Sequence, residues 1–148
     1  MSVLNSLRTA GSALTAQRLR MDVTSSNIAN AEATRTPEGG PYKREQVVFS
    51  PIRQDFQSYL QPLSLRQDPT ANGGVAVAAI QQDDTPPKML YEPAHPDADQ
   101  DGYVAYPNVD LVTEMTDLLS ASRAYEANVT VINVAKNMAQ KALDLGRM

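Results

Sequence analysis

The last 41 residues of the chain, 108–148, read NVDLVTEMTDLLSASRAYEANVTVINVAKNMAQKALDLGRM and contain no proline. Apolar residues, with a few polar interruptions, recur here in steps of three and four, the heptad pattern of a helix that buries one stripe. The stripe consists of Leu111, Met115, Leu118, Ser122, Tyr125, Val129, Ile132, Lys136, Ala139 and Leu143. With Asn108 as its N-cap, the pattern predicts one helix of about 38 residues, against a usual length of about 12 in globular proteins.

The first 36 residues also lack proline and repeat the same pattern. Their stripe consists of Leu4, Leu7, Gly11, Leu14, Arg18, Met21, Ser25 and Ile28. The spacing predicts a helix over Val3–Ala29 that is capped by Ser2. Asn30 is expected to end it, because Asn tolerates the left-handed conformation used at helix C-termini.

All ten prolines lie in the middle of the chain, from Pro37 to Pro107. Proline is excluded from helix interiors, so this part is predicted to be rich in turns. Runs of β-branched and aromatic residues predict strands at Tyr42–Ser50 and Val75–Gln81, and shorter ones at Lys88–Tyr91 and Tyr103–Tyr106.

Together these segments predict an α+β fold, in which two long terminal helices pair as an antiparallel coiled coil with a small, loop-rich β unit between them. The corresponding domains are residues 1–36, 37–107 and 108–148. Both helices also carry alanines off the main stripe, which offer a second face to other molecules. Such a chain can be a monomeric helical hairpin or a subunit that assembles head to tail into a filament, and periodicity leaves both interpretations open.

Composition excludes several classes of protein. The net charge of −4 and the pI near 4.9 make the chain acidic, whereas a nucleic-acid-binding protein needs positive charge to contact phosphates. The chain has no cysteine and one histidine, His95, and its longest apolar run, Val75–Ile80, is far too short to span a membrane. The N-terminus lacks the pattern of a cleaved secretory signal. We therefore expect no nucleic-acid partner, no membrane span, no catalytic or metal site and no cofactor.

One acidic segment, Asp97–Gly102 (DADQDG), reproduces the first six positions of an EF-hand calcium loop. The twelfth position is Asn108, where an EF-hand requires a bidentate Glu, and prolines occupy the place of the incoming helix. An acidic surface loop is therefore favoured, with calcium binding as an alternative. His95 lies near two prolines and is expected to be a turn residue rather than a catalytic base.

Two motifs, one near each end of the chain, carry a family resemblance. The N-terminal motif consists of Ser26–Asn30, Thr34 and Gly40–Arg44, and the C-terminal motif of Asn108–Asp110, Glu114–Met115, Arg123, Tyr125–Asn128 and Ile132. Both resemble the bacterial flagellar basal-body rod proteins. The segments His95–Asp99, Gly102–Val104 and Tyr106–Val109 are most similar to the C-type branch of the proximal rod. Residues 49–84 lie outside the resemblance.

The resemblance implies a structural, non-enzymatic subunit of the flagellar rod, the axial drive shaft that transmits motor torque for motility. Its terminal helices would form the axial core, with the middle of the chain outside. The implied partners are other rod subunits, the membrane-ring protein and the rod-base adaptor protein. The implied location is the periplasmic basal body, reached through the flagellar type III export apparatus without a cleaved signal. A calcium-binding module and a coiled-coil adaptor outside the flagellum remain as alternatives.

The candidate subunit-interface residues combine the two stripes with the family motifs. They are Leu7, Leu14, Met21, Asn27, Ile28, Asn30, Leu111, Met115, Leu118, Arg123, Tyr125, Glu126, Asn128, Val129 and Ile132.

Overall fold

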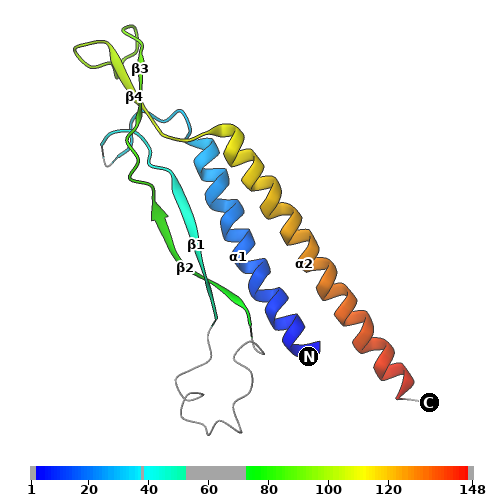
Figure 1. Cartoon of the computed structure of the whole chain (residues 1–148). Coiled ribbons are helices and arrows are strands. Elements are labelled where there is room, and N and C mark those ends of the chain that lie inside the picture. The colour runs from blue at the N-terminus through cyan, green and yellow to red at the C-terminus, as the bar shows by residue number, and fades with distance from the viewer. Residues whose placement is uncertain (1–2, 38, 53–72, 147–148) are drawn as a thin grey trace, which may run out of the picture. The chain divides into compact units, whose positions relative to one another are not determined.

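The computed structural model describes residues 3–37, 39–52 and 73–146. The elements follow in the order α1 (Val3–Ala29), β1 (Glu45–Pro51), β2 (Val75–Gln82), β3 (Lys88–Tyr91), β4 (Tyr103–Tyr106) and α2 (Leu111–Leu145) (Figure 1). The predicted α+β class, with two long terminal helices and a small strand-containing region between them, is confirmed.

The helices lie where the absence of proline predicts them. α1 has the predicted bounds and 27 residues, and α2 has 35. Neither of these two helices, within the residues that the structure describes, is long and apolar enough to cross a membrane. All four strands are present, although β1 begins at Glu45 rather than at Tyr42. The amide of Tyr42 instead donates to the carbonyl of Ala33, which holds this residue in the turn before the strand.

The predicted N-cap of α2 is wrong, α1 ends before Asn30 as predicted but for a different reason, and the predicted cap Ser2 lies outside the described residues. α2 is capped by Asp110 and not by Asn108: the Asp110 carboxylate accepts hydrogen bonds from the amide of Val112 (3.1 Å) and the hydroxyl of Thr113 (2.9 Å). Asn30 follows α1 without adopting the left-handed conformation, since no described residue other than glycine has a positive φ. Its side-chain amide donates to the carbonyl of Ser26 at 2.9 Å and so satisfies the end of the helix directly.

The Asp110 cap predicts a pH-dependent contribution to stability. The Thr113 hydroxyl, followed by the amide of Val112, lowers the pKa of Asp110 below its usual value. A lowered pKa means that the unfolded chain binds the proton more readily than the folded chain. The cap therefore stabilises fully above the unfolded pKa of about 3.9, and its contribution disappears as the pH falls through the lower folded pKa.

We expect Asp110→Asn to lose less stability than the wild type over this acidic window. Urea unfolding between about pH 2 and pH 7 measures the difference. The matched control is Asp144→Asn, which changes an exposed carboxylate near the other end of α2 and should leave the profile as in the wild type. A difference between Asp110→Asn and the wild type that stays constant over the whole range would contradict this explanation.

The chain divides into two compact units, each of which contains parts of both helices. The terminal unit consists of Met1–Arg18, Phe49–Ala78 and Ser122–Met148, and the hairpin unit of Leu19–Val48 and Ala79–Ala121. β1 and β2 form one two-stranded sheet, and β3 and β4 form another. The division into domains 1–36, 37–107 and 108–148 concerns segments of an axial assembly and stays a prediction.

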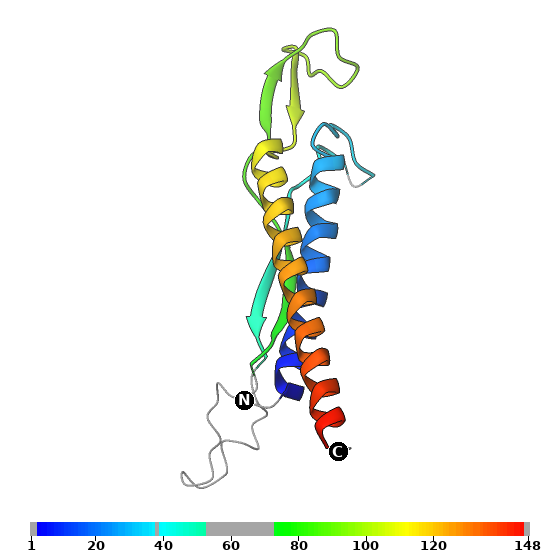
Figure 2. The same cartoon turned by 90° about the vertical axis from the view of Figure 1, so that its right-hand side faces the viewer.

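In the hairpin unit, the end of α1 and the beginning of α2 run side by side in opposite directions (Figures 1 and 2). Arg20 on α1 pairs with Asp117 on α2 at 2.8 Å, and Asn27, two turns later on α1, reaches Glu114, one turn earlier on α2. The helix segments of this unit are therefore antiparallel, as the sequence predicts.

In the terminal unit, a hydrogen bond to Ser12 connects α1 to the start of β2. The Ser12 hydroxyl accepts a hydrogen bond from the amide of Val75 at 3.1 Å and donates to the carbonyl of Thr9 at 2.8 Å. Gly74 permits this approach, because a Cβ atom at that position would lie 2.9 Å from the Ser12 oxygen.

The helix faces that the chain buries differ from the predicted stripes. The buried helix residues are Ala10, Ala16, Val23, Thr24 and Asn27 on α1 and Glu114, Ala121 and Ala135 on α2. Leu4, Leu111, Met115 and Leu143, all predicted stripe residues, are exposed. The predicted heptad period is right, but each helix buries a neighbouring face of small residues, because alanine lets helix backbones approach closely. Leu118, Tyr125 and Ile132 are half-buried and belong to both faces.

Candidate assembly surface and its buried polar cluster

Asn27 is the centre of a buried polar cluster in the hairpin unit. Its Nδ2 donates to the carbonyl of Glu45 (2.8 Å) and to Oε2 of Glu114 (3.0 Å). Its Oδ1 accepts from the Tyr42 hydroxyl (2.9 Å) and from the amide of Glu45 (3.0 Å). An Asn side chain has two donor and two acceptor positions, so its hydrogen-bonding capacity is filled within the chain. Asn27 pairs with both backbone groups of Glu45 and thereby fixes the first residue of β1 against α1.

Glu114 joins the first turn of α2 to the same cluster. Its side chain is only 1% exposed, and its Oε1 accepts a hydrogen bond of 2.6 Å from Nε of Arg44, whose side chain is 18% exposed. Arg44 also lies 3.9 Å from Asp117, which pairs with Arg20 on α1. A buried carboxylate is tolerated only with such partners, because an unpaired buried charge is strongly destabilising.

Tyr42 closes the cluster as a neutral hydrogen-bond donor. Burial is the largest influence on its hydroxyl and raises the pKa of Tyr42, and the nearby carboxylates of Glu45 and Glu114 raise it further. The hydroxyl therefore keeps its proton near neutral pH and donates to Asn27.

The cluster is suited to fixing the alignment of α1, β1 and α2 rather than to catalysing a reaction. It ties together α1, β1 and α2, and every polar side chain described in it is paired with another group of the chain. Buried polar groups of this kind specify one alignment of helices over others that an apolar contact would tolerate. The two adjacent basic residues differ in their surroundings: Lys43 pairs loosely with exposed Asp84 at 3.5 Å, whereas Arg44 belongs to the buried cluster.

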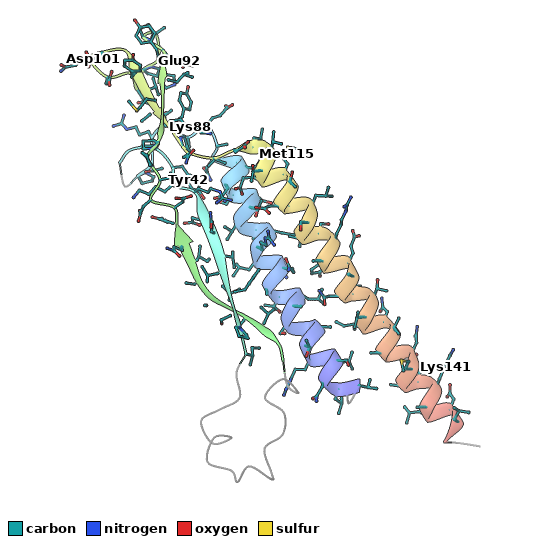
Figure 3. The ribbon with its side chains drawn as sticks, in the orientation of Figure 1. Tyr42, Lys88, Glu92, Asp101, Met115 and Lys141 are labelled. Carbon is teal, nitrogen blue, oxygen red and sulfur yellow. The ribbon has the colours of Figure 1, made fainter. Side chains whose placement is uncertain are left out.

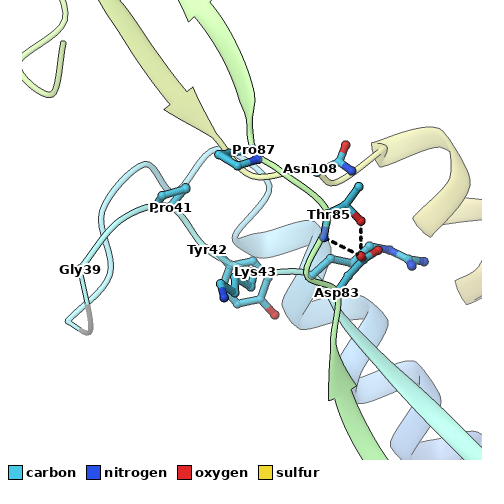
Figure 4. Close-up of a pocket in the computed structure, with 9 residues that line it drawn as sticks. Gly39, Pro41, Tyr42, Lys43, Asp83, Thr85, Pro87 and Asn108 are labelled. Atoms are coloured by element: carbon cyan, nitrogen blue, oxygen red, sulfur yellow. Dashed lines mark hydrogen bonds between the residues drawn. The ribbon is translucent and has the colours of Figure 1, made fainter. Parts of the chain in front are cut away.

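A small pocket of about 150 Å³ lies beside the cluster (Figure 4). Its lining consists of turn residues and strand ends, among them Pro41, Lys43, Asp83 and Pro87. The Asp83 carboxylate already accepts hydrogen bonds from the amide and the hydroxyl of Thr85. These bonds lower the pKa of Asp83, so this side chain serves the turn.

Two carboxylates of the calcium-loop segment also have hydrogen-bond partners within the chain. Oδ1 of Asp99 accepts from the amides of Asp101 (3.0 Å) and Tyr103 (2.8 Å), and Asp97 accepts from the Thr34 hydroxyl at 2.8 Å. Within the described part of the chain, no group of three or more potential ligands is placed to hold a metal ion. Nδ1 of His95 accepts from the amide of Asp97 at 3.1 Å, the position of a turn residue.

The candidate interface residues divide by exposure. Fully buried Asn27 belongs to the polar cluster. The half-buried residues are Leu7, Leu14, Met21, Ile28, Asn30, Leu118, Tyr125, Asn128, Val129 and Ile132. The exposed ones are Leu111, Met115, Arg123 and Glu126. Figure 3 shows Met115 near the start of α2.

Sequence reasoning missed a second stripe on α2. We name it the outer stripe: its members are exposed and follow steps of four and three, and they are Ala127, Val131, Val134, Met138, Lys141 and Leu145. Val131, Val134 and Met138 line an open apolar pocket of about 360 Å³ together with Val3 and Ser6 of α1. The sequence contains this spacing, but the predicted stripe beside it has more large apolar residues and gives the stronger signal.

Comparisons with known proteins agree with this architecture at both ends of the chain. Residues 7–35 match the model of the flagella basal body rod protein family, and residues 100–145 match that of the flagellar basal body rod FlgEFG protein C-terminal region. The flagellar basal-body rod protein FlgC of Borreliella burgdorferi is 50% identical to this chain over 97% of both sequences. The proteins of the same name from Bacillus subtilis and Salmonella typhimurium are each 44% identical, over 99% of this chain and 100% of their own length.

The fold and these matches first define a class, the structural subunits of the flagellar basal-body rod. Within that class, the chain belongs to the FlgC family of flagellar basal-body rod proteins. The resemblance noted in the sequence is thereby confirmed. Neither the calcium-binding module nor the adaptor outside the flagellum gains support.

Proposed function

We propose that this chain is a non-enzymatic subunit of the proximal part of the rod, where its terminal helices pack in the axial core and its middle region faces outward. In this position it transmits motor torque as part of the drive shaft. The observation that carries the proposal is the outer stripe: Val131, Val134 and Met138 are 47%, 52% and 59% exposed on a 35-residue helix. A row of large apolar side chains in water favours contact with another molecule.

The partners proposed for this surface are other rod subunits, with the membrane-ring protein and the rod-base adaptor protein at the rod base. The candidate interface residues on α1 and α2 are proposed to contribute to the same contacts, Asn27 by holding the helices in register. Delivery to the periplasm is proposed to proceed through the flagellar type III export apparatus without removal of a signal peptide.

The proposal predicts that Val134→Glu abolishes motility and rod formation in a strain that lacks the wild-type gene. A charge in the middle of the outer stripe opposes burial against a neighbouring subunit, while the exposed position leaves the fold of the single chain intact. Swimming in soft agar and electron microscopy of isolated basal bodies measure the effect.

The matched control is Asn133→Glu, which places the same charge on the adjacent exposed residue, outside the stripe. It should support normal motility. Gene deletion that leaves complete, motile flagella would refute the proposed function, as would normal rods built from the Val134→Glu protein.

A further inference from the structure

The β3–β4 hairpin has one face that is apolar and exposed to solvent. Its antiparallel register pairs Met89 with Ala105 and Tyr91 with Tyr103, and paired residues share a face. The alternate pairs, Leu90 with Val104 and Lys88 with Tyr106, occupy the other face, where Val104 is completely buried and Leu90 is 51% exposed. Met89 is 56% exposed and Tyr91 62%. We call Met89, Tyr91, Tyr103 and Ala105 the Tyr91 face.

Two aromatic rings pack against each other on the Tyr91 face. The rings of Tyr91 and Tyr103 meet edge to face with their centroids 5.3 Å apart. Gly102 lies under the Tyr91 ring with φ +83°, and a Cβ atom there would lie 2.9 Å from the ring. Tyrosine and methionine are both enriched at protein interfaces, and tyrosine buries a large area at small cost in conformational entropy. The hairpin thus presents two aromatic rings to solvent.

The surroundings of this face are acidic. Between residues 88 and 106 there are four carboxylates (Glu92, Asp97, Asp99 and Asp101) against the single basic residue Lys88. Glu92 and Asp101 lie in the loop that joins β3 and β4 (Figure 3). The amine of Lys88 donates to the carbonyl of Val109 at 3.4 Å and does not neutralise the carboxylates of the loop.

Charge is distributed unequally between the two units. Among the described residues, the hairpin unit has five basic and twelve acidic side chains, a net charge of −7. The terminal unit has five basic and two acidic side chains, a net charge of +3. Lys141 of the terminal unit belongs to the outer stripe, between Met138 and Leu145. The outer stripe therefore combines apolar residues with a basic one, whereas the apolar Tyr91 face adjoins an acidic loop.

We propose that the Tyr91 face binds the outer stripe of a second copy of this chain, with Lys141 of that copy opposite the acidic loop. Two Tyr91 faces in mutual contact would place like charges together, so the contact joins different surfaces of the two copies. A head-to-tail contact of this kind extends into a filament unless its rotation closes a ring. The proposal rests on the proposed function as an assembling subunit and names one of the surfaces used.

The test is a charge exchange in the full-length protein, followed by sedimentation velocity at low salt. Asp101→Lys and Lys141→Glu should each weaken self-association about 5- to 10-fold, because each places like charges opposite one another. The double variant restores opposite charges and should return to within about twofold of the wild type. Circular dichroism checks that each variant keeps its helices.

The matched control is Lys136→Glu, which makes the same charge change on α2 outside the outer stripe and should leave self-association unchanged. Additive losses in the double variant would overturn the proposal, as would an equal loss in Lys136→Glu or a wild type that stays monomeric up to about 1 mM. Normal self-association of the single variants, with rods lost in cells, would assign the face to a different subunit and also overturn it. These outcomes leave the proposed function intact, since that function is tested separately, by the gene deletion and by Val134→Glu.

Discussion

Arg44→Met is expected to lower the free energy of unfolding by roughly 3–5 kcal/mol, the largest effect of any single substitution considered for this chain. The methionine keeps most of the apolar volume of arginine but removes the donor that lies 2.6 Å from Glu114. Glu114 is 1% exposed and then keeps one hydrogen bond, from Asn27, for a buried carboxylate. Urea unfolding followed by circular dichroism measures the loss.

Lys43→Met is the matched control for this substitution. Lys43 precedes Arg44 in the sequence and also forms an ion pair, but both partners of that pair are exposed. Exposed pairs contribute at most about 1 kcal/mol, so Lys43→Met should stay close to the wild type. Equal losses in the two variants would show that the buried pair has no special importance.

Asn27→Ala is expected to cost roughly 2–4 kcal/mol. The substitution removes a hydrogen-bond partner from both backbone groups of Glu45, from the Tyr42 hydroxyl and from one oxygen of buried Glu114, at a site that is largely buried. Asn27→Asp should be at least as damaging, because it loses both donors and places a second negative charge beside Glu114. Asn30→Ala, which removes bonds only within the last turn of α1, should cost about 0.5–1.5 kcal/mol.

Hydrogen exchange at the Glu45 amide separates this mechanism from a general loss of stability. That amide donates to the Asn27 side chain and should lose its protection in Asn27→Ala before the amides of the α1 interior do. Uniform loss of protection along α1 and β1 would argue against a local role of Asn27.

The elements of this fold could be predicted because each depends on a local property. Proline is confined to residues 37–107, which left the two ends of the chain free to form helices, and the heptad spacing then predicted the bounds of α1. The β-branched run at Val75–Ile80 likewise marked β2. The cap at Asp110 was missed because Asn108 and Asp110 are both good N-caps, and the choice depends on where Pro107 directs the chain.

The polar cluster could not be predicted, because its partners are distant in the sequence. Asn27 and Glu114 are 87 residues apart, and Arg44 and Glu114 are 70 apart. Asn27 was predicted to lie in a subunit interface, and neither Asn27 nor Arg44 has a local feature that marks it as buried. The sequence also left open which stripe of each helix faces inward. α2 carries several stripes at heptad spacing, and the buried stripe is selected only when the alanine-rich backbones approach each other.

The central claim is that the outer stripe of α2 is built for contact with another subunit. A cryo-electron microscopy map of the rod, in basal bodies of the organism that encodes this chain, tests it most directly. We predict that Val131, Val134 and Met138 are buried against a neighbouring rod subunit. A map in which these three side chains face solvent, with subunits joined through other surfaces, would contradict the account.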